Sequence, residues 1–190
     1  MDARIKEARS LVEAALHASD RRRYSKLLEW AKRVLAPLAE ENVPEAVWML
    51  ASLPAKPDSS VSLDEFDRRY FQQAEEAARL GSAEAMFYLG CELDCEPTVA
   101  RSSRYFEAAS GLGHTYSTWC FGLNLLSGHG TARNVSRGMA LVRQAAEERF
   151  EGAIQFISRA YEQGSYGLPR DEAAAAAWLS KLKDKDVIHY

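Results

Sequence analysis

The sequence predicts an all-α protein in which pairs of helices are stacked along the chain. Strand signals are nearly absent, because no alternating run rich in Val, Ile and Thr occurs. Ala, Leu, Glu and Arg dominate instead, and apolar residues recur at helical spacing. A similar local pattern also returns about every 36 residues, a period typical of helical repeats. Since one helix pair cannot bury its apolar faces alone, neighbouring pairs are expected to stack.

Composition and charge exclude several classes of protein. The 190 residues, 47% of them apolar, suffice for one globular domain or one short solenoid. The net charge of −3 by itself favours neither a nucleic-acid binder nor a disordered acidic tail. The charge is unevenly spread, since residues 1–39 carry nine basic and five acidic side chains, residues 40–99 four and thirteen, and residues 100–190 eleven and nine. The middle block is therefore strongly acidic.

The first 23 residues predict an amphipathic helix over about 2–18, not a signal peptide, because charges run throughout and an apolar h-region is missing. No segment approaches the ~18 continuous apolar residues of a membrane helix. The three cysteines, Cys91, Cys95 and Cys120, are an odd number without a framework spacing, which fits a reducing compartment. Together these features predict a cytoplasmic protein without membrane insertion.

Four stretches share one pattern, in which a helix ends, the chain turns tightly and a second helix begins. They are PLAEENVPEAVWMLA (37–51), EAARLGSAEAMFYLG (76–90), ASGLGHTYSTWCFG (109–122) and QAAEERFEGAIQFIS (144–158). A small residue follows each turn, at successive intervals of 39, 32 and 36 residues: Ala46, Ala85, Ser117 and Ala153. A second small residue lies further along each second helix: Ala51, Gly90, Gly122 and Ser158. Small residues at these places let helices approach closely.

The first helix of each pair carries a landmark residue, defined by its place eight residues before the turn. These landmark residues are Val34, Gln73, Tyr105, Leu141 and, after the last loop, Trp178. From the large apolar residue of each second helix to the next landmark the separations are 23, 16, 20 and 21 residues, counted from Leu50, Leu89, Phe121 and Ile157. The helices therefore keep register, and the connecting loops alone vary in length.

The repeat resembles the Sel1-like repeat, a relative of the tetratricopeptide repeat. The last copy matches best, through Ile157, Ser158, Tyr161, Gly164, Gly167, Leu168, Asp171, Ala174 and Trp178. The third copy matches through FGLNLLSGHGTARNVSRGMALVRQAA, with Leu125 in place of the family's tyrosine. The second copy loses the glycine loop, and the first is degenerate. The resemblance covers about residues 24–183.

The resemblance implies a right-handed α-solenoid of about four helix pairs with a capping helix at each end. Residues 1–23 would form the N-terminal capping helix, and residues 24–183 the repeat solenoid. The helix from Asp171 to about Lys183 would cap the other end, its five alanines forming a small-residue packing face. Residues 184–190 would be a polar, exposed C-terminal tail.

No catalytic constellation is recognisable in the sequence. SGHGTARN (127–134) contains Gly-x-Gly, but no strand precedes it and no Lys-Ser/Thr follows it, so the phosphate-binding contexts fail. A helix-connecting turn with positive φ at glycine explains it. Cys91, Cys95, Cys120 and His114 are nominal metal ligands, but their spacing is not that of a zinc site, and buried free thiols are the favoured interpretation. We therefore expect no enzyme, metal or cofactor.

Two sets of charged residues are candidate partner-binding positions. In helical-pair solenoids the first helices line the concave face, so arginines predicted on them are contact candidates: Arg68, Arg69, Arg101, Arg104, Arg137 and Arg143. The acidic block supplies the second set: Glu75, Glu76, Glu92, Asp94 and Glu96. These carboxylates would meet a basic face on the partner, where charge complementarity gives fast association and specificity. An ordinary solvated surface explains the same charges.

The sequence thus predicts a non-enzymatic protein–protein interaction module. Its most concrete form is a cytosolic bacterial immunity protein that binds and occludes a basic toxin or effector. The alternative is an adaptor or regulatory scaffold of a bacterial signalling or secretion assembly, as the resemblance implies. A binder of peptidoglycan fragments, or an enzyme, is a third hypothesis. No nucleic-acid partner is expected.

Overall fold

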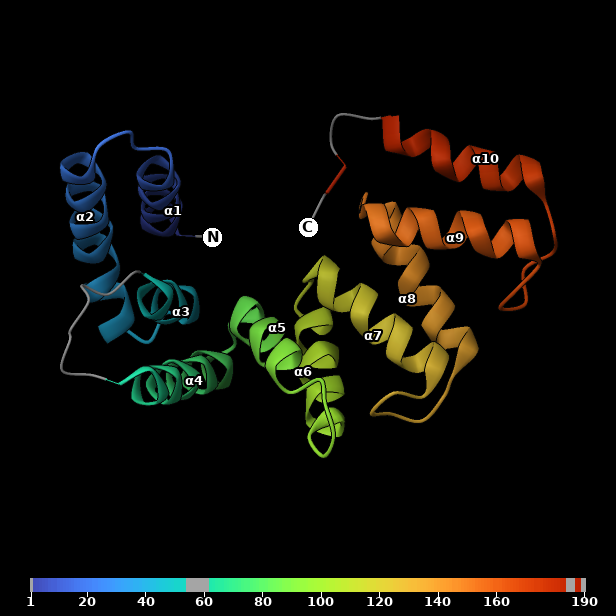
Figure 1. Cartoon of the computed structure of the whole chain (residues 1–190), viewed down its shortest axis with the longest axis horizontal. Helices are drawn as coiled ribbons and strands as arrows, with labels where there is room; N and C mark the ends of the chain where they lie inside the picture. The colour runs from blue at the N-terminus through green and yellow to red at the C-terminus, as the bar shows by residue number, and fades with distance from the viewer. Residues whose placement is uncertain (1, 54–61, 184–186, 189–190) are drawn as a thin grey trace. The chain divides into compact units, whose positions relative to one another are not determined.

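The all-α prediction is confirmed by the computed structural model, which describes residues 2–53, 62–183 and 187–188 (Figure 1). The helices of this part are α1 (Ala3–Leu16), α2 (Arg21–Glu40), α3 (Pro44–Ser52), α4 (Leu63–Leu80), α5 (Ala83–Glu92), α6 (Val99–Gly111), α7 (Thr115–Ser127), α8 (Val135–Glu147), α9 (Glu151–Gln163), α10 (Glu172–Ser180) and the short 3-10 helix η1 (Lys181–Lys183). The chain divides into two compact units, Met1–Met86 and Phe87–Tyr190, and the division falls within α5.

In the first unit α1 packs against α2, α2 against α3, and α3 against α4. The predicted N-terminal helix is confirmed as α1, which buries Ile5 and Ala8 in a core shared with Leu35 of α2. Both helices begin at an aspartate whose carboxylate accepts a backbone N–H bond, and at Asp20 that bond comes from Arg23 N at 2.8 Å. Such caps satisfy helix-end donors that have no intrahelical partner.

In the second unit α6, α7, α8, α9 and α10 also pack in chain order. Two helix starts in this unit use the residues that the repeat pattern places there, because Asn134 accepts from Arg137 N at 3.0 Å and Asp171 accepts from Ala174 N at 2.9 Å. Two helix ends use glycine, since α7 stops at Gly128 (φ +84°) and α9 at Gly164 (φ +65°). The glycine loops are therefore turns that need left-handed backbone, as predicted.

The small residues predicted to follow each turn are all fully buried: Ala46, Ala85, Ser117 and Ala153. Each lies in the first turn or two of a second helix, where the chain has just reversed direction. A larger side chain there would hold the two helices of a pair apart. The repeat register and the pairing of sequential helices are thereby confirmed, whereas the handedness of the solenoid and its domain boundaries stay predictions.

The second set of small residues marks where one repeat meets the next. Ser102 Oγ of α6 donates to the Gly90 carbonyl oxygen of α5 at 2.7 Å. Ser158 Oγ of α9 donates to the Ala175 carbonyl oxygen of α10 at 3.0 Å. In both cases a second helix touches the first helix of the following repeat, three residues before its landmark.

Between α7 and α8 the same contact is made by Gly122 and Gly138, without side chains. A Cβ atom on Gly138 would lie 2.9 Å from the Gly122 carbonyl oxygen and 2.8 Å from Leu126 Cδ2. This separation is shorter than ordinary van der Waals contact, so glycine is a packing requirement here.

Two predictions about the C-terminal end are wrong. Of the five alanines predicted to form a packing face, Ala175 is buried and Ala174 half-buried, but Ala173, Ala176 and Ala177 are exposed. The predicted polar tail is not exposed throughout, because Val187 is buried. Its neighbour Ile188 donates to the Arg149 carbonyl oxygen at 2.9 Å and accepts from Glu151 N at 3.2 Å. These backbone bonds tie the end of the chain to the α8–α9 turn.

We expect Gly138→Ala to destabilise the protein although alanine is the better helix former. The added methyl gains about 1 kcal/mol of intrinsic helix propensity, but it collides with backbone that cannot rotate away. Overpacking of this kind costs about 1–3 kcal/mol, so the urea midpoint should fall. The matched control is Gly111→Ala, a helical position with open space around its Cβ, which should be neutral or stabilising. Equal stability of the two variants would contradict the packing requirement.

Candidate functional site

The first helices place arginines at equivalent positions. Counting four residues back from each landmark gives Trp30 on α2, Arg69 on α4, Arg101 on α6 and Arg137 on α8. All four side chains are exposed. Because the helices keep register, this position is displayed in the same way on each repeat, and tryptophan replaces arginine in the first.

Arg137 is held in place on the face that it shares with α6 and α7. Its Nη2 donates to Glu107 Oε1 at 2.7 Å, and its guanidinium carbon lies 5.1 Å from the centroid of the Phe121 ring. An exposed ion pair contributes little stability, so the main effect of this contact is to restrict the position of the arginine side chain. A guanidinium fixed over an aromatic ring loses less freedom when it binds a partner carboxylate.

The remaining candidate arginines lie in different surroundings. Arg68 and Arg69 both bind Glu65 one turn earlier on α4, and the Arg69 hydrogen bond lowers the pKa of the Glu65 carboxyl. Arg101 and Arg104 lie exposed on α6. Arg143 is half-buried on α8 and lies 5.9 Å from the Trp178 ring centroid. The prediction that these residues occupy first helices is confirmed, but their role in binding stays a prediction.

The acidic candidates divide between the two units. Glu75 and Glu76 lie on α4, where Glu75 is half-buried and Glu76 binds Arg79 at 2.6 Å. The Arg79 hydrogen bond lowers the pKa of the Glu76 carboxyl. Glu92, Asp94 and Glu96 are exposed at the end of α5 and in the loop that follows.

Asp94 has a structural role that the sequence did not predict. Its Oδ1 lies 2.9 Å from His129 Nε2 and 3.3 Å from Ser102 Oγ. These contacts join the α5–α6 loop to the α7–α8 loop. Asp94 is therefore committed to neighbours within the protein, whereas Glu92 and Glu96 are better placed to meet a partner.

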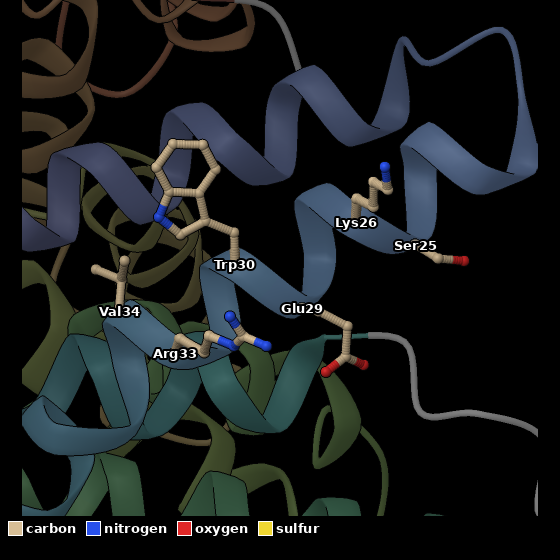
Figure 2. Close-up of a pocket in the computed structure, with 6 residues that line it drawn as sticks. All are labelled: Ser25, Lys26, Glu29, Trp30, Arg33 and Val34. Carbon is tan, nitrogen blue, oxygen red and sulfur yellow. The ribbon is translucent and has the colours of Figure 1, made fainter.

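A hollow of about 570 Å³ lies on α2, and sequence reasoning missed it. Its lining residues are Ser25, Lys26, Glu29, Trp30, Arg33 and Val34 (Figure 2). Trp30 is 55% exposed, and the charged groups of Lys26, Glu29 and Arg33 flank it on the same helix. The available signal was a lone tryptophan among charged residues on the solvent side of an amphipathic helix.

The cysteines correct one prediction. Cys91, Cys95 and Cys120 are free thiols, but Cys91 and Cys95 are exposed rather than buried. Cys120 is half-buried on α7, and burial raises the pKa of its thiol to about 12. Across the residues that the structure describes, no group of three or more His, Cys, Asp or Glu side chains is placed to hold a metal ion. No helix among them is long and apolar enough to span a membrane.

Comparison with known proteins places the fold. No family model and no curated protein matches the sequence. Among solved structures, the chain is similar to a Sel1 repeat protein from Oxalobacter formigenes, with a TM-score of 0.72 and 18% identity over 95% of this chain and 71% of that one. It is also similar to c5321, a protective antigen of uropathogenic Escherichia coli strains with an SLR fold, with a TM-score of 0.70 and 23% identity.

That second alignment covers 97% of this chain, which spans 38% of the length of c5321. The two likenesses establish the fold: the chain has the architecture of Sel1 repeat proteins, as its sequence predicted.

Thiol reactivity should separate the three cysteines. At pH 8 we expect a thiol-specific disulfide reagent to modify Cys91 and Cys95 in the native protein and to leave Cys120 largely unmodified. A thiol with a pKa of about 12 is almost entirely protonated at pH 8, and the thiolate is the nucleophile. Spectrophotometric titration should count two thiols in buffer and a third in guanidinium. A wild-type protein that shows three reactive thiols in buffer, or a Cys120→Ser variant that shows only one, would refute the assignment.

Proposed function

We propose that the protein is a non-enzymatic protein-interaction module. The observation that carries the proposal is the hollow on α2, where Trp30 is exposed among Lys26, Glu29 and Arg33. Tryptophan and arginine are the residues over-represented at the energetic centres of protein interfaces. An open helix surface with alternating charges suits a protein better than a small molecule, which needs an enclosed cavity.

The equivalent arginines support the same function. Arg69, Arg101 and Arg137 lie on α4, α6 and α8 at the repeat position that Trp30 occupies on α2. Arginine presents five N–H donors in a planar fork that matches carboxylates. Within the first unit, a partner segment with an apolar anchor and a carboxylate would contact Trp30 and Arg69.

In its most concrete form, we propose a cytosolic bacterial immunity protein that occludes a basic toxin or effector stoichiometrically. The support is the acidic block of residues 40–99, with exposed carboxylates on Glu76, Glu92 and Glu96. A toxin that acts on nucleic acid or nucleotides carries a basic face, which such carboxylates would cover.

Charge reversal tests the immunity hypothesis. We expect the protein to co-purify at low salt with a basic protein encoded in the neighbouring reading frame. Reversing the exposed Glu76, Glu92 and Glu96 to lysine should weaken that complex at least about tenfold, because like charges then meet. Glu147→Lys, an exposed reversal on α8 outside the acidic block, is the matched control and should bind normally. Unchanged affinity in the triple variant would eliminate the acidic face.

The hollow on α2 is tested separately, with the same partner. Trp30→Ala should raise the Kd about thirtyfold or more, the loss of 2 kcal/mol or more that truncating a central aromatic anchor causes. Since Trp30 is exposed, the melting temperature should stay close to that of the wild type. Isothermal titration with Leu16→Ala, another exposed apolar truncation in the first unit, is the control. If both truncations bind like wild type, the hollow is not the interface.

The alternative is an adaptor or regulatory scaffold of a bacterial signalling or secretion assembly. This alternative is favoured because the candidate contact residues are divided between the two units. Trp30 belongs to the first unit, whereas Arg101 and Arg137 belong to the second. An adaptor holds two partners at once, whereas an immunity protein is saturated by one. Recovery of a ternary complex would favour the adaptor.

A further inference from the structure

Among the residues that the structure describes, no second helix covers the face of α10 that corresponds to the faces covered on α2, α6 and α8. The residue after each landmark is buried in four repeats, at 0–3% exposure: Leu35, Ala74, Phe106 and Val142. In the fifth, Leu179 follows the landmark Trp178 and is 40% exposed. Two further pairs of equivalent positions show the same loss of burial. Met139 and Ala146 of α8 are buried, whereas their counterparts in the last repeat, Ala176 and Lys183, are exposed.

The earlier repeats show what covers this position. Leu35 of α2 packs in one cluster with Ala46 and Met49 of α3. Phe106 of α6 packs with Phe121 and Leu125 of α7.

Val142 of α8 packs in one cluster with Ile154 and Ile157 of α9. The cover is thus the second helix of the same repeat each time. After α10 the described chain continues as η1 and then as Val187 and Ile188, of which Ile188 pairs with Phe150 at the α8–α9 turn.

The uncovered face borders a hollow. A volume of about 420 Å³ is lined by Glu162, Arg170, Glu172, Ala175, Ala176 and Leu179. The apolar side chains of Ala175, Ala176 and Leu179 form its floor. The charged side chains of Glu162, Arg170 and Glu172 form its rim. Arg170 and Glu172 pair at 3.5 Å, but both are largely exposed, so either can exchange this contact for a partner.

We propose that this face of α10 docks an amphipathic α-helix supplied by another protein, which takes the place of a fifth second helix. Four copies of the repeat specify that helix. It carries a small residue where it comes closest to α10, as at Ala46 and Ala153, and aliphatic residues one turn on, as at Ile157. A basic side chain beside Glu162 or Glu172 would complement the rim. Helix-in-groove recognition reuses the packing that already builds the protein.

A second copy of this chain fits the face less well. The nine residues of α10 extend about 13 Å, at 1.5 Å per residue. Two such faces would bury far less than the roughly 800 Å² per partner of a stable dimer. A single helix from a larger partner needs no such area. It would bind weakly and dissociate readily. This surface is distinct from the hollow at Trp30 and does not depend on the proposed function.

The test uses one of the protein's own second helices, α9, because it already packs against a first helix in this structure. An acetylated, amidated, fluorescent peptide with the sequence of residues 149–163, which contains α9, is titrated into the full chain and followed by anisotropy. We expect saturable binding with a Kd in the range of about 10–500 μM, as suits a small interface. Leu179→Lys should weaken binding at least about tenfold by placing a charge in the apolar floor.

Ala173→Lys is the matched control, since it adds the same charge at an exposed α10 position whose α8 counterpart, Ser136, is also exposed. It should bind like wild type, and so should Trp30→Ala. Far-ultraviolet melting checks that both lysine variants fold, and peptide-induced amide protection should map to α10.

Three results would overturn the proposal. One is no binding at about 1 mM peptide, which corresponds to less than about 4 kcal/mol. Another is equal weakening by Ala173→Lys and Leu179→Lys. The third is concentration-dependent self-association that Leu179→Lys abolishes, which would assign the face to a second copy.

Discussion

The close approach of helices at small residues is the contact on which the rest of the second unit depends. Gly90 meets Ser102, Gly122 meets Gly138, and Ser158 meets Ala175, each time at the same place in the repeat. Because a Cβ atom at Gly138 would lie within 2.9 Å of backbone, the spacing between α7 and α8 is set by main-chain atoms. Backbone contact fixes helix register more firmly than flexible side chains can. Buried Val142, Ile154 and Ile157 then fill the remaining volume.

A constant register has a functional consequence. It gives each first helix the same exposed positions, so a binding residue introduced at one of them is repeated along the array. Arginine occupies such a position on α4, α6 and α8, and Trp30 occupies it on α2. The core holds the backbone, and the exposed face is free to vary, which is how one repeat fold serves different partners. The same logic leaves a first-helix position exposed where no second helix covers it among the described residues, as at Leu179.

Much of the fold was predictable from the sequence because its signals are local. Periodic small residues, glycines at helix ends and Asp171 as an N-terminal cap each act through their own neighbourhood, and the structure confirms them. The candidate site was less predictable. The arginines were expected on first helices and lie there, but the hollow at Trp30 was missed, since exposure of a tryptophan depends on which helix faces remain uncovered.

The sequence by itself determined the repeat, its register and the all-α class, because helix propensity, capping and spacing operate over a few residues. The tertiary structure alone decided which of the repeated positions are covered. It exposes Cys91 and Cys95, commits Asp94 to His129, folds Val187 back and leaves Leu179 open. The physical reason is that burial is a property of neighbours, and the same residue type at the same repeat position is buried or exposed according to whether another helix follows.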